Sequence, residues 1–354
     1  MTRFLRRWSW FLVFALAALV PLIDLVLPAR LRITGMLVPV VTYALVALGL
    51  NIVVGFTGLL HLGSAAFMAV GAYAFAILTA PCFPIQCGFW PGLALATLAG
   101  ALAGWALALP TMRLRGDYLT IVTLGCGEIV RELLKNLEPL TKGTQGINPL
   151  PPPALPWVTF TAAQPIPFYL LFLALLAGAV VVCRNLRHSA TGRAWTAVRE
   201  DELAAKSVGV RTDAAKRSAF TWGAGLCALG GALAASYSTG VEPSIYDFQM
   251  SVIILCIVVI GGMGSIAGVL IGAVVMMGFN QVGVPLLTGL MGGGAEAHPL
   301  LDANNWKFLI FGLALILAMR LRPEGLLPAR EVRAELHHDP DESDQEAVRA
   351  GDLR

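Results

Sequence analysis

Long apolar runs alternate along this chain with short polar or glycine-rich segments. The runs are close to the ~20 residues that an α-helix needs to cross a bilayer. They lack the strict apolar–polar alternation of strands in a membrane β-barrel. The pattern therefore predicts an all-α polytopic membrane protein with about ten transmembrane helices, some of them broken or re-entrant. The expected spans are 8–27, 36–57, 62–80, 90–111, 117–137, 166–183, 218–238, 249–263, 266–288 and 306–320.

Composition supports this interpretation of the pattern. The chain has 354 residues, of which 57% are hydrophobic and 13% are charged, and its mean hydropathy is +0.73. Soluble domains carry about 25% charged residues. We expect one transmembrane domain over residues 1–330, including a cytoplasmic loop at 187–217, and a disordered acidic cytoplasmic tail at 331–354.

Lysine and arginine are unevenly distributed between the loops, which predicts an orientation. Ten spans put both termini on the same side, and the charge bias makes that side cytoplasmic. The loops on this side hold Arg113, Arg115, Arg320, Arg322 and the 184–217 segment with its eight Lys or Arg residues. The outer loops hold mainly Arg30, Arg32 and Lys142, of which the two arginines are exceptions to the bias.

Polar residues and glycines interrupt the apolar runs in two places. The first is "LGLNIVVGFTGLLHLGSAAFMAVGAY" at 48–73, and the second is "SVIILCIVVIGGMGSIAGVLIGAVV" at 251–275. Broken helices are tolerated in a membrane where they line a cavity or are buried in protein, so cavity lining and helix packing both remain open. The two stretches lie at similar positions in the two halves of the chain, which indicates a substrate pathway between internal repeats. The residues of interest in the first stretch are Asn51, Gly55, Gly58, His61 and Ser64.

A third polar interruption lies in the expected span 117–137. Glu128 and Arg131 are three residues apart, so they share a helix face and can form an ion pair. Charged residues within a span usually face a cavity or the protein interior. The alternative is that the helix ends early and leaves residues 128–135 at the outer headgroups.

Sequence motifs for enzymatic chemistry are absent. The five histidines are scattered, and neither a phosphate-binding loop nor a metal-binding spacing occurs. We therefore expect no catalytic residue, no metal and no cofactor, and a protein that is not an enzyme. Cys82 and Cys87, in an outer loop, form either a disulfide or two free thiols.

One block of charge lies between the apolar halves, with ten charged residues among the 26 residues of 192–217. Thr191 can cap a helix that begins near residue 193. Gly209 is placed to end this helix, and Thr212 or Asp213 can cap the next one. The expected apolar face of the first helix consists of Ala194, Val198, Ala205 and Val208. A solvated loop that follows the charge bias is the alternative, but it does not explain the sequence Glu202-Leu203-Ala204-Ala205 followed by Gly209.

That sequence resembles the EAA-type loop of ABC importer permeases, in which a short coupling helix docks into an ATPase subunit. More broadly, the chain resembles the M-type permeases of branched-chain amino acid ABC transporters over roughly residues 40–275. The matching segments occur in the family's order: "ALGLNIVVGFTGLLHLGSAAFMAVGAY", "RLRGDYLTIVTLGCGEIVR", "GTQGI", "GRAWTAVREDELAAKSVGV" and "VVIGGMGSIAGVLIGA".

The resemblance implies a permease of the bacterial inner membrane that works by alternating access. Its expected partners are a sister permease, two cytoplasmic ATP-binding subunits, a periplasmic amino-acid-binding protein and membrane lipid, with no nucleic acid. It implies that Glu202, Ala204, Ala205 and Gly209 are the ATPase-coupling positions. The expected translocation-pathway positions are Asn51, Gly55, Gly58, His61, Ser64, Glu128 and Arg131, although the histidine and serine stand in exchanged order relative to the family pattern.

Three other functions remain open from the sequence. A permease for urea or short amides would share most of these motifs. An ion-coupled secondary transporter would need intramembrane carboxylates, for which Glu128 and Asp24 are the candidates. A non-transporting membrane scaffold would not need the glycine-broken spans.

Overall fold

The computed structural model describes most of the chain between residues 14 and 327. The described residues are 14–21, 24, 34–111, 114, 116–153, 160–161, 164–285, 303–321 and 325–327. Most of the expected first span 8–27 and all of the expected tail 331–354 lie outside them, as does 154–159 in the proline-rich loop.

Most of the described residues are helical. Two isolated bridges pair Ile147 with Val241 and Thr161 with Gln164. The long elements are α2 (Thr34–Asn51) with its π-helical continuation η2 (Ile52–Phe56), α3 (Ser64–Thr79), α4 (Phe89–Thr111), α5 (Asp117–Asn136), α7 (Pro165–His188), α10 (Thr212–Ser238), α11 (Phe248–Gly261), α12 (Ile266–Gly278) with its π-helical continuation η5 (Phe279–Gly283), and α14 (Ala303–Leu321). The short elements are α6 (Glu138–Thr141), η3 (Gly143–Gln145), α8 (Ala190–Glu200), α9 (Glu202–Ser207) and η4 (Pro243–Ile245).

The described helices agree with the all-α membrane class and lie within a few residues of the expected spans. The largest differences are at α7, which continues beyond residue 183 to His188, and at α10, which begins at Thr212 instead of 218. Both extensions carry lysine or arginine, which a hydropathy pattern counts against a span although the helix continues into the polar region.

Five helical segments within the described residues are long and apolar enough to cross a membrane: 34–56, 89–111, 165–188, 212–238 and 266–283. The apolar helices α3 and α11 are shorter. α5 has sufficient length but carries four charged residues between 128 and 135. The protein is therefore a multi-pass membrane protein by length and composition, and the total of about ten spans stays a prediction.

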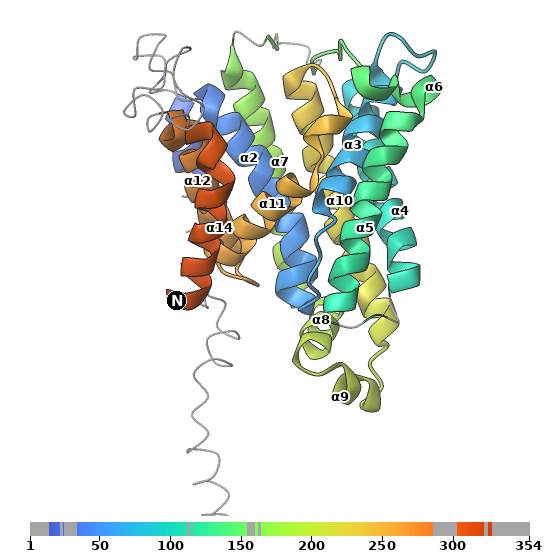
Figure 1. Ribbon diagram of the computed structural model, residues 1–354, viewed down its shortest axis with the longest axis vertical. Coiled ribbons are helices and arrows are strands. Elements are labelled where there is room, and N and C mark those ends of the chain that lie inside the picture. The colour runs from blue at the N-terminus through green and yellow to red at the C-terminus, as the bar shows by residue number, and fades with distance from the viewer. Residues whose placement is uncertain are drawn as a thin grey trace, which may run out of the picture.

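α10 packs against α2, α3 and α4 in the centre of the bundle (Figure 1). Small residues allow the backbones to approach closely, as is common between helices in membranes. A Cβ atom at Gly71 of α3 would overlap the backbone of Ala228 in α10, and one at Gly100 of α4 would overlap the Ala228 side chain. This tight contact makes α2, α3, α4 and α10 one packed unit.

Two of the helices begin in the interior of the bundle (Figure 1). The non-helical segment 58–63 leads from η2 into α3, and the segment 239–247 contains only the short η4 before α11. A further interruption at 262–265 separates α11 from α12. The interruptions expected in 48–73 and 251–275 are thus located at 58–63 and 262–265. Figure 1 also shows that α8 and α9 project from one end of the bundle, opposite to α6.

Candidate functional site

A small, partly open pocket with room for about one water molecule lies where the starts of α3 and α11 meet the middle of α5. Its lining combines aliphatic and aromatic surface with two carboxylic acids. The lining residues are Leu62, Ala65, Ala66, Leu124, Gly127, Glu128, Tyr246, Asp247, Phe248 and Ser251. The space is far smaller than a formed small-molecule cavity, so in this chain alone these residues line a surface and do not enclose a ligand.

Side chains fix the helix starts around this pocket. Ser251 Oγ accepts a hydrogen bond from the Ala65 N–H of α3 at 3.1 Å. Asp247 caps α11 by accepting a bond from the Met250 N–H at 2.9 Å. Thr123 Oγ1 of α5 accepts a bond from the Leu62 N–H at 3.2 Å. The two interior helix starts are therefore held to each other and to α5.

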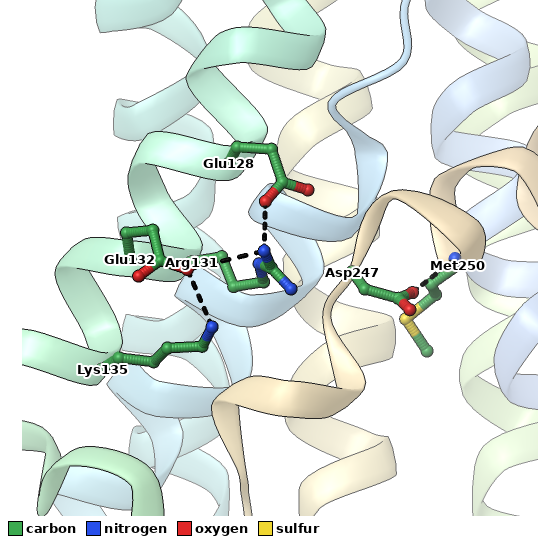
Figure 2. Close-up of polar contacts among 6 residues, drawn as sticks. All are labelled: Glu128, Arg131, Glu132, Lys135, Asp247 and Met250. Atoms are coloured by element: carbon green, nitrogen blue, oxygen red, sulfur yellow. Dashed lines mark hydrogen bonds and ion pairs between the residues drawn. The ribbon is translucent and has the colours of Figure 1, made fainter.

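Charged side chains of α5 form a short chain of ion pairs beside the pocket (Figure 2). Arg131 lies 2.6 Å from Glu128 and 3.5 Å from Glu132, and Lys135 lies 2.8 Å from Glu132. The predicted Glu128–Arg131 pair is present, and α5 stays helical to Asn136 instead of ending before these residues. Figure 2 shows Arg131 on the side of α5 that faces the start of α11, where Asp247 lies.

The helix that ends at the first break contacts the second break, at 262–265, through Asn51 of α2 and Gly55 of η2. Asn51 Oδ1 accepts a hydrogen bond from the Gly264 N–H at 2.9 Å, and Asn51 is fully buried. A Cβ atom at Gly55 would overlap both Asn51 Oδ1 and the Gly264 nitrogen. These two residues therefore allow a close approach between the breaks, and they are not among the residues that line the pocket.

The same break also contacts α8. The Arg199 Nη1 group donates to the Gly55 carbonyl oxygen at 2.8 Å. Gly58 has a φ of +69°, and a Cβ atom there would lie 3.0 Å from Arg199 Cγ. Phe56 stacks on Trp195 of α8 with ring centroids 6.3 Å apart.

His61 and Ser64 are buried in aromatic packing beside the break. The His61 ring stacks on Phe67 at 5.2 Å and meets Phe220 edge-on at 5.3 Å. Neither His61 nitrogen nor Ser64 Oγ has a hydrogen-bond partner among the described residues. Of the seven residues expected along a pathway, Glu128 lines the pocket and Arg131 forms an ion pair with Glu128. The other five lie between residues 51 and 64, in the first helix break or in the helix ends on either side of it. A role for them in translocation stays a prediction.

The charged loop folds as two short helices instead of the single expected one. Asp201 interrupts it, because its carboxylate accepts bonds from the N–H groups of Leu203 at 2.7 Å and Ala204 at 3.0 Å. The donors of Ala204 and Leu203 lower the pKa of the Asp201 carboxyl group below its ordinary value. Asp201 thus caps α9. The expected cap of the first helix was wrong, since α8 begins at Ala190 and Ser189 caps it instead of Thr191.

At the end of this loop, the predicted turn at Gly209 is confirmed and the predicted cap of the next helix is wrong. Gly209 has a φ of +88°. Its N–H group donates to the Lys206 carbonyl oxygen, and the Val210 N–H donates to that of Ala205, which together form a Schellman motif. The expected capping by Thr212 or Asp213 was wrong, because α10 already begins at Thr212 and has no side-chain cap.

α10 holds the charged loop through buried contacts. Glu202 Oε1 lies 2.7 Å from the Nζ of Lys216, whose side chain is only 4% exposed. Trp195 is fully buried, and its Nε1 group donates to the Ala215 carbonyl oxygen at 3.0 Å and to Ser218 Oγ at 2.9 Å.

The exposed side of α9 differs from the expected one. Ala205 is buried against the bundle, whereas Ala204 and Gly209 are exposed. Val208, expected on the buried face, is 80% exposed because the helix ends before it, and Leu203 is 66% exposed. α9 therefore presents two large apolar side chains at the end of the molecule.

Several contacts of this region were not predicted from the sequence. They involve Trp195, Arg199, Lys216 and Asp247. A tryptophan inside a charged loop was the one available signal, because its large ring requires a buried partner. The arginine contacts join residues that are distant in sequence, and no local pattern indicates them.

Cys82 and Cys87 are free thiols, as are the other four cysteines. The described residues contain no group of three or more His, Cys, Asp or Glu side chains that could hold a metal ion.

Comparison with known proteins identifies relatives across most of the chain. Residues 32–319 match the family model described as branched-chain amino acid transport system / permease component. The permease protein LivM of the high-affinity branched-chain amino acid transport system is 38% identical in Salmonella typhimurium, over 81% of this chain and 68% of LivM. LivM of Escherichia coli K12 is 36% identical, over 86% of this chain and 72% of LivM.

The second permease protein of the same system, LivH of Escherichia coli K12, is 26% identical over 82% of this chain and 92% of LivH. No solved structure matches the chain at a significant level. The match over most of the chain, with LivM of two bacteria at 38% and 36% identity, shows that the chain belongs to the permease components of branched-chain amino acid transport systems.

Proposed function

We propose that this chain is the M-type permease subunit of an ATP-driven importer of branched-chain amino acids. The observation that carries this proposal most directly is the fold of the charged loop, which projects α9 from one end of the bundle while Glu202 and Trp195 hold it to α10. The family consists of permease components, so ATP hydrolysis belongs to separate subunits.

The tip of α9 is the proposed docking site for an ATP-binding subunit. Leu203 and Val208 are largely exposed there and would enter an apolar cleft of the partner. Glu202 points inward to Lys216, so its proposed role is to hold α9 in place. Ala205 allows the close packing of α9, Ala204 lies on its exposed side, and Gly209 forms the turn that ends it.

The sister permease is the proposed partner of α5. The exposed face of α5 mixes the apolar Ile129 and Leu133 with Glu132, which is 51% exposed, and a charged group within a span needs water or protein around it. The large exposed residues of α4, among them Leu98, Leu102 and Trp105, are all apolar and suited to lipid. We therefore place α5 along a pathway between two permease subunits and α4 against lipid.

We propose that the pocket beside α5 lines the path of an aliphatic amino acid in transit. Glu128 and Asp247 provide negative charge for an ammonium group, and Leu62, Leu124 and Phe248 provide apolar surface. The chain binds and releases its substrate in this mechanism without covalent chemistry. Alternating access would open the pathway to either side as the ATP-binding subunits close and separate.

The proposed orientation puts α8, α9 and both termini in the cytoplasm and the α6 end toward a periplasmic binding protein. The lysines and arginines of the 184–217 segment support this orientation. Family membership and the apolar helices support a multi-pass protein of the bacterial inner membrane.

Reconstitution tests the function directly. The complete complex, with a sister permease, two ATP-binding subunits and a binding protein, is placed in liposomes and supplied with leucine, isoleucine, valine, urea or a short amide. We expect ATP-dependent uptake of the three amino acids. Uptake of urea or the amide alone would contradict the proposed substrate, and uptake driven by an ion gradient without ATP would contradict the proposed mechanism.

A further inference from the structure

The end of the first helix segment, η2, depends on a donor from the charged loop. Carbonyl groups at the end of a helix have no partner within the helix, and the partial negative charge there attracts cations. Arg199 of α8 supplies both a donor and a positive charge, with its Nη1 group 2.8 Å from the Gly55 carbonyl oxygen. The aliphatic part of the same side chain packs over Gly58.

The second helix break has a similar arginine contact. Arg187, near the end of α7, donates from Nη1 to the Gly264 carbonyl oxygen at 3.1 Å. The N–H group of the same glycine donates to Asn51 Oδ1 at 2.9 Å. Asn51 of α2 and Arg187 of α7 thus bind both polar backbone groups of Gly264. These two bonds join the turn at 262–265 to α2 and α7.

Aromatic contacts link the two arginine sites. The Arg187 guanidinium lies over the Phe56 ring, 5.6 Å from its centroid, and Phe56 stacks on Trp195 of α8 at 6.3 Å. Trp195 is in turn hydrogen-bonded to α10. A continuous set of packed and hydrogen-bonded side chains therefore runs from α8 to both helix breaks.

We propose that Arg187 and Arg199 are positioning residues that transmit movement of α8 and α9 to the helix breaks at 58–63 and 262–265. This inference rests on the proposed function, in which ATP-binding subunits move α9. A planar guanidinium group holds its acceptors in a fixed geometry. The element that responds is η2, because π-helical segments are rare and frequently occur at functional sites.

Movement of the two breaks would act on the pocket through the helices that join them to it, α3 and α11. The segment 58–63 provides Leu62 to the pocket wall and leads directly into α3, whose start provides Ala65 and Ala66. α11 joins the turn at 262–265 to Phe248 and Ser251, which also line the pocket. A pull on Gly55 and Gly264 therefore reaches the pocket through both α3 and α11.

The test uses the complete complex in liposomes with Arg199→Ala, Arg199→Lys and the control Arg193→Ala. Arg193 is exposed on the same helix and bonds the nearby His188 carbonyl. Three quantities are measured: co-purification of the ATP-binding subunits, ATP hydrolysis, and leucine uptake per ATP hydrolysed. For Arg199→Ala we expect normal co-purification and at least a tenfold fall in uptake per ATP. Arg199→Lys, which keeps a donor, should recover part of the ratio, and Arg193→Ala should equal the unaltered protein.

The outcomes separate this inference from the proposed function. An unaltered complex that shows no ATP-dependent uptake would contradict the function itself. Loss of the ATP-binding subunits from Arg199→Ala, an unchanged uptake ratio, or an equal fall in Arg193→Ala would overturn the inference and leave the function in place. A fall confined to the apparent affinity for the loaded binding protein, at unchanged maximal rate, would also overturn it.

Distances between spin labels provide a second test in a cysteine-free background. One pair joins Ser207→Cys, at the exposed end of α9, to Leu60→Cys in the first break, and the reference pair joins Ser207→Cys to Leu109→Cys on α4. On ATP binding we expect the first distance to stay constant and the reference distance to change. Adding Arg199→Ala should broaden the first distance. A first distance that varies equally with and without Arg199 would overturn the inference.

Discussion

Among the single residues of the charged loop, Lys216 carries a charge in an almost fully buried position. Its side chain is 4% exposed and its ammonium group pairs with Glu202 at 2.7 Å. Removing one partner of a buried pair leaves an uncompensated charge, which costs roughly 3 kcal/mol or more. Glu202 therefore acts on docking indirectly, because it fixes the position from which Leu203 and Val208 are presented.

Charge reversal at this pair tests the indirect role. Glu202→Lys should place two ammonium groups together, release α9 and lose the ATP-binding subunits on co-purification. We expect hydrogen exchange in 202–210 to rise on the order of 100-fold, which corresponds to about 3 kcal/mol. The double variant Glu202→Lys, Lys216→Glu should restore both measurements. Glu200→Lys, an exposed change on α8, is the control, and failure of the double variant would contradict the pairing role.

Gly55 is the residue at which the two helix breaks meet most closely. Gly55→Ala would force Asn51 and Gly264 apart, and overpacking of this kind costs about 1–3 kcal/mol. We expect a lower thermal unfolding temperature of the purified permease. Gly178→Ala on α7 is the matched control, because no atom lies within 4 Å of the added carbon and alanine favours a helix. Equal stability of the two variants would show that the breaks are not in tight contact.

Among the helices, α5 and α4 differ in what their exposed faces can contact. In the complete complex, Ile129→Cys or Leu133→Cys of α5 should crosslink to cysteines scanned along the sister permease. Leu98→Cys and Leu102→Cys of α4 should give no crosslink, because lipid covers them. The measurement is the yield of crosslinked heterodimer after oxidation. Crosslinks from α4 and none from α5 would reverse the proposed interface.

The helices were largely predictable from the sequence, whereas their contacts were not. Apolar runs locate α2, α4 and α11 within two residues, because burial in lipid or protein requires a continuous apolar stretch. The division of the charged loop at Asp201 depends on a local choice between two helix starts, and hydropathy carries no information on this choice. The arginine contacts of the candidate site join residues such as Arg199 and Gly55, which are 144 positions apart.

For the molecule as a whole, the two ends of the bundle differ in the helices and loops that they carry. One end carries α8 and α9 with the lysines and arginines of the charged loop. The other end carries α6, near which the exposed loop with Cys82 lies, since Lys142 packs over the Phe83 ring at 5.9 Å. Cytoplasmic segments are enriched in lysine and arginine, so the two ends should be accessible from opposite sides of the membrane.

Labelling of single cysteines tests this orientation. One variant keeps only the native Cys82, and the other carries only Val208→Cys, both with an exposed side chain. Both are expressed without the ATP-binding subunits, which would cover Val208. A membrane-impermeant maleimide should label Cys82 in intact spheroplasts and Val208→Cys only in inverted vesicles, because the reagent cannot cross the bilayer. Labelling after denaturation gives the total thiol of each sample. The opposite pattern would place α9 outside the cell, where no ATP-binding subunit could reach it, and both the orientation and the docking role of α9 would be wrong.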